Sequence, residues 1–205
     1  MVTPFSPVET LHRMSVTALM AALITAGALL HVQIGPVPIT FQELFVCLAG
    51  FVLGPRYGVY AVALYIVAGL LGLPVFSGGR SGFAHLLGPT GGYLVGFLFL
   101  AFFAGVGARL VQRYAPEPPV TASVEERESL ALSAKVVGLA FAPAALGMLI
   151  LYTCGVLWMV ARLGWPMEKA IALGVTPFLP LGLPKVALAS LFFRVLRKRG
   201  LAGKW

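Results

Sequence analysis

The stretch Gly69–Tyr93 reads GLLGLPVFSGGRSGFAHLLGPTGGY and separates two long apolar runs. Glycine allows a backbone to turn tightly and to approach a neighbouring group closely. In a membrane protein, irregular backbone is tolerated only where it is buried in protein or lines a cavity. We therefore interpret this glycine-rich passage as a candidate wall of a binding site.

The composition places the chain in a membrane. The 205 residues are 59% hydrophobic and 11% charged, and their mean hydropathy is +0.93. Soluble domains carry about 25% charged residues, so this chain has too little polar surface to cover a water-facing globule. No stretch is long enough for a separate soluble domain, and we expect a single unit over 1–205.

Six apolar runs predict an all-α protein with six transmembrane helices. A bilayer core needs about 20 helical residues, and the second and third runs are short for that. The one clearly soluble stretch is 112–132, which is rich in proline and acid and is predicted to be a cytoplasmic loop. The runs cover residues 14–33, 41–54, 58–73, 91–111, 133–161 and 170–195.

The net charge of +8 follows membrane topology rather than nucleic-acid binding, because the basic residues adjoin apolar runs. With both termini in the cytoplasm, four basic residues lie outside: Arg80, Arg162, Lys169 and Lys185. The other eleven of the 15 lie inside: Arg13, Arg56, Arg109, Arg113, Arg127, Lys135, Arg194, Arg197, Lys198, Arg199 and Lys204. This bias is typical of a multi-pass protein of the cytoplasmic membrane, with the glycine-rich passage outside.

The sequence gives no support to an enzyme, a metal site or a bound cofactor. The chain contains no Asp, and its only Gly-Lys pair, Gly203-Lys204, is not part of a phosphate-binding loop. The three histidines are far apart, and both cysteines lie in apolar runs. Nothing pairs a nucleophile with a base.

Small residues recur every four positions in three places. Ala18, Ala22 and Ala26 form such a series in the first run, and two glycine series occupy 50–58 and 88–96. A smooth stripe lets another helix approach closely in lipid. For the alanine series, packing inside the bundle and docking of a partner protein are both open; for the glycine series, internal packing is favoured.

Several stretches resemble the BioY family, the biotin-specific S components of energy-coupling-factor (ECF) vitamin transporters. The matching stretches are GPVPITFQ (35–42), AGFVLGPRYG (49–58), GLLGLPVFSGG (69–79), LLGPTGGYLVGF (86–97) and PFLPLGLPKVALA (177–189). The resemblance implies high-affinity capture and import of biotin. It also implies a transmembrane coupling protein and paired ATPase subunits as partners, with Ala18, Ala22 and Ala26 as the docking face.

One departure from the family pattern concerns recognition of the ligand. The family usually carries Gly-Asp where this chain has Leu181-Gly182, three residues before Lys185. That Asp is a natural acceptor for the ureido N–H groups of biotin. Glu43 is our hypothesis for a substitute acceptor, since it follows Gln42 at the outer start of the second run.

The candidate site is mostly apolar with a few placed polar groups, as small-molecule sites usually are. Of the two candidate partners of the ligand carboxylate, we favour Lys185 over Arg80, because Arg80 lies in a loop and Lys185 lies inside an apolar run. Alternatively, the Lys185 side chain extends to the membrane interface and binds no ligand. Arg80 is alternatively a solvated charge in its loop. The full set of candidates is Thr40, Gln42 and Glu43 for the ureido group, Phe76, Leu87 and Tyr93 for the walls, Lys185 or Arg80 for the carboxylate, and Gly78, Gly79, Gly91 and Gly92 for backbone contacts.

Three alternatives to biotin import through an ECF module stay open at this point. Gly182 in place of Asp is compatible with an S component for another small vitamin. A non-transporting membrane scaffold would bind no ligand and would leave the polar residues of the outer face unexplained. A stand-alone facilitator would work without the ATPase module.

Overall fold

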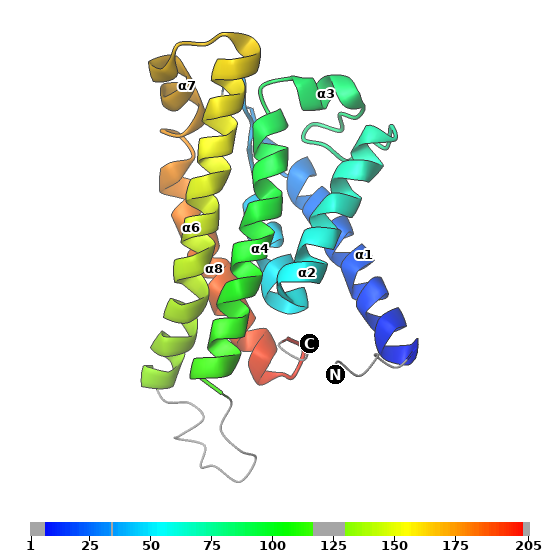
Figure 1. Ribbon diagram of the computed structural model, residues 1–205, viewed down its shortest axis with the longest axis vertical. Helices are drawn as coiled ribbons and strands as arrows, with labels where there is room; N and C mark the ends of the chain where they lie inside the picture. Colours follow the sequence, from blue (N-terminus) through cyan, green and yellow to red (C-terminus); the bar gives the residue numbers. More distant parts are fainter. Residues whose placement is uncertain (1–6, 34, 117–129, 203–205) are drawn as a thin grey trace.

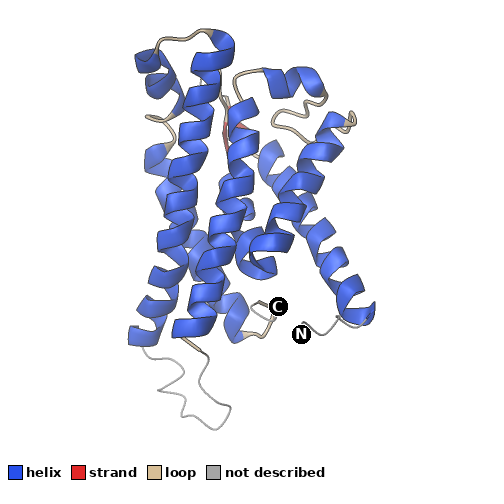
Figure 2. Ribbon diagram, in the orientation of Figure 1, coloured by secondary structure: helices blue, strands red, loops and turns tan. Residues whose placement is uncertain are grey.

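The computed structural model describes residues 7–33, 35–116 and 130–202. These residues form a bundle of long helices that run roughly side by side, as Figure 1 and Figure 2 show. The elements are α1 (Pro7–Leu29), β1 (His31–Val32), β2 (Ile39–Thr40), α2 (Gln42–Leu70), α3 (Phe83–Leu87), α4 (Gly91–Tyr114), α6 (Leu130–Leu163), α7 (Met167–Gly174) and α8 (Leu179–Lys198). Most of the predicted loop 112–132 falls on 117–129, outside the described residues.

Helix α2 bends back on itself at Gly54, whose backbone φ of 76° is not helical. Gln42 Nε2 donates a hydrogen bond of 2.7 Å to Tyr65 Oη, although a straight helix would separate these residues by about 34 Å. The two arms, 42–53 and 55–70, therefore lie against each other. Figure 1 shows the bend, in cyan, above the lower ends of α4 and α6.

This bend joins two of the six predicted apolar runs in one element, α2. Among the described residues, five helices are long and apolar enough to cross a membrane: α1, α2, α4, α6 and α8. The predicted runs 41–54 and 58–73 are the two arms of α2, and each arm is shorter than the roughly 20 residues that a bilayer core needs. Helix α2 thus consists of two helical arms on either side of Gly54, close to the bounds of the two predicted runs. The number of six membrane crossings stays a prediction.

The predicted run 170–195 also differs from the structure, since it contains two helices, α7 and α8. The chain leaves the helical path at Val175, where φ is −122°. Pro177 then disfavours a helical conformation at Thr176, the residue before it. Helix α8 starts only after this interruption, with a proline in its first turn.

The two ends of the bundle differ in character. Helix α1 begins and α8 ends at the lower end in Figure 1, where α4 also ends and α6 begins. Those helix ends carry Arg113, Arg197 and Lys198. At the opposite end, the antiparallel β1–β2 pair, α3 and α7 close the bundle, and the strands appear in red in Figure 2.

Helix α4 lies at the centre of the bundle, and small residues let it approach α2 and α6. A Cβ added to Gly50 of α2 would overlap the Ala101 carbonyl oxygen of α4. A Cβ on Gly96 of α4 would lie 2.7 Å from the Leu151 Cα of α6. Internal packing therefore explains both of these glycines, which confirms at these two positions the interpretation that we favoured for the glycine series.

The alanine series of α1 faces away from the other helices of the bundle. Ala18, Ala22 and Ala26 are all exposed on the bundle surface, whereas Ala21 and Ile24 between them are buried. Packing within this chain therefore does not account for the alanine series, which leaves a smooth stripe on the outside of the helix.

Gly50→Ala tests the tight crossing of α2 and α4. We expect it to lower the free energy of unfolding by about 1–3 kcal/mol, because the added methyl group forces packed backbone apart. The measurement is thermal unfolding of the full chain in detergent. Gly138→Ala is the matched control, since Gly138 is exposed on α6 and its added Cβ meets nothing within 4 Å. Equal unfolding temperatures for the two variants would contradict the close crossing.

Candidate functional site

A small cavity of about 40 Å³ lies at the end of the bundle closed by β1–β2 and α3. The β2 segment, both arms of α2, the glycine-rich passage, α4 and α6 all contribute to its wall. Most of the lining is apolar, and the polar groups come from positions far apart in the sequence. The lining residues are Val37, Pro38, Thr40, Gln42, Glu43, Tyr65, Ser77, His85, Thr90, Tyr93, Leu94, Phe97, Leu151 and Phe178.

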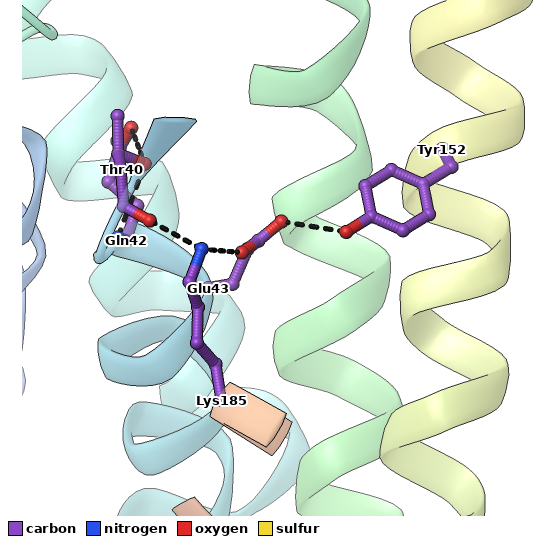
Figure 3. Close-up of polar contacts among 5 residues, drawn as sticks. All are labelled: Thr40, Gln42, Glu43, Tyr152 and Lys185. Carbon is purple, nitrogen blue, oxygen red and sulfur yellow. Dashed lines mark hydrogen bonds and ion pairs between the residues drawn. The ribbon is translucent and has the colours of Figure 1, made fainter. Parts of the chain in front are cut away.

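Glu43 presents a buried carboxylate to this cavity and pairs with Lys185 of α8. Lys185 Nζ lies 2.6 Å from Glu43 Oε2, and their side chains are only 11% and 8% exposed. The other oxygen, Oε1, accepts a hydrogen bond of 3.1 Å from Tyr152 Oη. Figure 3 shows how α2, α6 and α8 meet at this carboxylate. A buried charge is tolerated only with partners of this kind, and these two contacts hold the carboxylate in one orientation.

Lys185 also donates a hydrogen bond of 2.7 Å to the Thr40 carbonyl oxygen. This contact fixes the end of β2 to α8. Among the described residues that line the cavity, Glu43 is present and Lys185 is not. Lys185 is thus a positioning residue, which orients Glu43 and the β2 segment from behind the cavity wall.

Gln42 is held at both ends of its amide group. Its Nε2 donates to Tyr65 Oη at 2.7 Å, and its Oε1 accepts from Thr40 Oγ1 at 3.1 Å. These bonds join the two arms of α2 at the cavity. The break at Gly54 is therefore what brings Tyr65 to the site.

At position 182, where the family pattern has Asp, the space beside the glycine is filled by other side chains. A Cβ at position 182 would overlap Tyr152 Oη and lie 3.0 Å from Met148 Sδ. The space that a side chain on α8 would need is filled by Tyr152, whose hydroxyl group reaches Glu43. An acid at 43 and a tyrosine at 152 therefore occupy this corner of the site together.

Tyr93 forms a wall of the cavity and ties together the elements around it. Its hydroxyl group donates to the Gly174 carbonyl oxygen at 2.6 Å, and its ring lies 6.2 Å from that of Phe178. Gly155 on α6 has no side chain to collide with the ring, and any Cβ there would overlap it. The ring is therefore available to an apolar ligand, while the hydroxyl group is already paired.

The glycine-rich passage folds over the cavity around Phe76, which is fully buried. The Phe76 ring stacks on His85 with centroids 4.9 Å apart, and it packs against Gly69. His85 Nε2 lies 3.2 Å from Thr90 Oγ1. Burial, together with the nearby charge of Arg80, lowers the pKa of His85 from its usual 6.5, so that its ring is neutral at neutral pH.

A wide mouth of about 460 Å³ lies next to the cavity and opens to the surface. His85 and Thr90 line both spaces, so they mark the neck between them. Gly79 and Arg80 line the mouth, and Arg80 is exposed there. The cationic group thus stands outside the neck and the anionic group, Glu43, inside it.

The predicted site residues divide into four groups by position. At the cavity lie Thr40, Gln42, Glu43 and Tyr93; at the mouth lie Gly79 and Arg80; behind the wall lie Phe76 and Lys185; and elsewhere lie Gly78, Leu87, Gly91 and Gly92. Gly91 and Gly92 pack closely on Trp158 and Cys154 of α6, which accounts for both glycines without a ligand. Leu87 is exposed, and Gly78 faces His31.

Sequence reasoning missed several residues of the site. Tyr65, Ser77, Thr90 and Phe178 line the cavity, and Tyr152 contacts Glu43 from α6. Tyr65 and Tyr152 lie in long apolar runs, where an aromatic residue is most often part of the core. Ser77 and Thr90 belong to the glycine-rich passage, so a search of that passage for hydroxyl groups would have found them.

Comparison with known proteins gives a consistent result. Residues 2–201 match the BioY family. The chain is 37% identical over 175 residues to the probable biotin transporter BioY of Pyrococcus horikoshii, covering 85% of this chain and 90% of that protein. It is 37% identical over 182 residues to the biotin transporter BioY of Thermotoga maritima, covering 88% and 92%. The crystal structure of the S-component for biotin from an ECF-type ABC transporter superposes with a TM-score of 0.77, at 26% identity and 95% coverage of both chains.

A double-mutant cycle on Glu43 and Lys185 tests the buried ion pair. Glu43→Gln and Lys185→Met should each destabilise the fold, by up to about 3–5 kcal/mol, because each leaves the other group without its counter-charge. The variant with both changes should recover a large part of the loss. The measurement is thermal unfolding of the full chain in detergent.

The matched control for this cycle is Glu168→Gln with Lys169→Met, an acid and a base that are both exposed on α7. Their effects should be small and should add. Additive losses at Glu43 and Lys185 would contradict the pairing.

Proposed function

This chain belongs to the BioY family, and from that membership we propose that it is the biotin-binding S component of an ECF-type transporter. It is a transporter component rather than an enzyme. Its task is the high-affinity capture of biotin and its import across the cytoplasmic membrane. The observation that carries the proposal for this particular chain is the buried Glu43 carboxylate at an otherwise apolar cavity.

Glu43 suits the ureido ring of biotin because that ring carries two N–H donors. A carboxylate that is held in place by Lys185 and Tyr152 needs no reorganisation to accept a further hydrogen bond. Each carboxylate oxygen has lone pairs beyond the one used in those contacts. Glu43 thereby supplies the acceptor that the family usually carries at the position of Gly182.

The remaining walls suit the apolar parts of the ligand. Leu94, Phe97, Leu151 and Phe178 offer hydrocarbon and aromatic surface, which matches a thioether ring and a methylene chain. A space of about 40 Å³ holds only a few water molecules. Binding of biotin therefore requires the cavity to widen.

The orientation in the membrane follows from charge. The helix ends that carry most of the basic residues face the cytoplasm in this proposal, and the cavity end faces outward. The ligand is then captured from outside. Release inside requires a second state that exposes the site to the cytoplasm and binds the ligand less tightly.

The partners in this proposal are a transmembrane coupling protein and a pair of ATPase subunits. They would supply the energy, since the sequence carries no phosphate-binding loop. The exposed stripe of Ala18, Ala22 and Ala26 offers the coupling protein a helix surface that it can approach closely in lipid.

Isothermal titration of the purified chain with biotin tests the function directly. We expect saturable binding of one biotin per chain, with a Kd below about 1 μM, weaker binding of desthiobiotin and none of riboflavin. Tight binding of riboflavin without biotin would favour an S component for another vitamin. A folded sample that binds no vitamin would favour a membrane scaffold.

Glu43→Gln should weaken biotin binding by about 10- to 100-fold, because hydrogen bonds to a charged acceptor contribute about 1.5–3 kcal/mol. The titration is done on protein that still elutes as a single species from size-exclusion chromatography. Glu168→Gln, on the exposed face of α7, is the control and should bind as the unchanged protein does. An unchanged affinity of Glu43→Gln would show that the ureido acceptor is another group.

Ala22→Leu should weaken uptake and co-purification with the coupling protein, while the isolated chain keeps its biotin affinity. The added bulk lies in the middle of the stripe and holds the partner helix away. Ala142→Leu, at an exposed position of α6, is the control. Normal co-purification of Ala22→Leu would place the docking surface elsewhere.

A further inference from the structure

Ser77 carries a buried hydroxyl group that has no role in the contacts around Glu43. The residue is 7% exposed, and it lines the cavity. Its Oγ is the one buried side-chain oxygen or nitrogen without a hydrogen-bond partner among the residues that the structure describes. Buried polar groups nearly always have a partner, so this exception calls for an explanation.

The backbone holds Ser77 firmly in this position. The Phe76 carbonyl oxygen accepts a hydrogen bond of 2.9 Å from the Gly79 N–H, and the Phe76 N–H donates one of 2.9 Å to the Arg80 carbonyl oxygen. Gly78 and Gly79 have φ angles of 76° and 71°, which residues with side chains rarely adopt. Ser77 thus belongs to a closed turn that is anchored by the buried Phe76 ring.

The polar neighbours of Ser77 in the wall are already paired with each other. Thr90 Oγ1 and His85 Nε2 lie within hydrogen-bond distance, at 3.2 Å. His85 and Thr90 also line the open mouth, and the turn that carries Ser77 continues to Gly79 and Arg80 of that mouth. Ser77 therefore belongs to the neck side of the cavity, where the wall continues to a cation.

Charge orients an acidic ligand along this cavity. Glu43 repels a carboxylate and accepts from N–H groups, whereas Arg80 attracts a carboxylate towards the mouth. Among the described residues that line the cavity, Ser77 has the one buried side-chain group without a hydrogen-bond partner. Resting on the proposed function, we propose that the Ser77 hydroxyl group donates a hydrogen bond to the carboxylate of bound biotin and contributes to the choice of an acid over a neutral analogue.

Ser77→Ala in the full chain tests this assignment through binding and stability together. Biotin affinity should fall about tenfold or more, as expected for a lost hydrogen bond to a charged group. The affinity for biotinol, in which CH₂OH replaces the carboxylate, should fall much less. The ratio of biotin affinity to biotinol affinity should therefore become smaller. The ligand-free protein should unfold at the same or a higher temperature, because the variant removes an unpaired buried hydroxyl group.

Ser190→Ala is the matched control, since Ser190 is also buried but its hydroxyl group donates to the Val186 carbonyl oxygen at 2.9 Å. It should leave the preference for biotin over biotinol unchanged. An equal loss for biotin and biotinol in Ser77→Ala would overturn the assignment to the carboxylate. So would unchanged biotin affinity together with a lower unfolding temperature, which would give Ser77 a structural role. Failure of the unchanged protein to bind biotin would instead count against the proposed function itself.

Discussion

The ion pair between Glu43 and Lys185 is the constraint on which the site depends. It brings the start of α2 against α8 at 2.6 Å, and the same lysine holds the β2 segment through the Thr40 carbonyl oxygen. Tyr152 brings α6 to the same carboxylate. Charges buried this deeply persist only when their partners are in place. One interaction thus fixes four segments of the chain around the cavity.

The sequence predicted the class of the fold and part of the site, and the reasons are local. Apolar runs indicate membrane helices wherever they occur. Glu43 was proposed because the Asp of the family pattern is missing at Gly182 and an acid lies beside Gln42 at the outer start of the second run. The union of two short runs into a bent α2, by contrast, depends on packing of Gly50 and Gly58 across the bend. Tyr65, Tyr152 and Phe178 reach the site through contacts between distant segments, and no pattern along one apolar run reports such contacts.

Small residues at four-residue spacing occur both inside the bundle and on its surface. Gly50 and Gly96 face inward and let helices touch backbone to backbone, which makes the frame around the cavity rigid. Ala18, Ala22 and Ala26 face outward and form the surface that we propose for docking of the coupling protein. Their spacing in the sequence is the same, so only the burial of each series separates an internal contact from an external one.

We propose Glu43 as the acid that recognises the ligand, with Lys185 behind it. A crystal structure of the protein with biotin bound tests this most directly. We expect a ureido nitrogen about 2.7–3.1 Å from a Glu43 carboxylate oxygen, with the Glu43–Lys185 pair intact and the biotin carboxylate towards Ser77 and Arg80. A biotin carboxylate paired directly with Lys185, and Glu43 turned away, would contradict it.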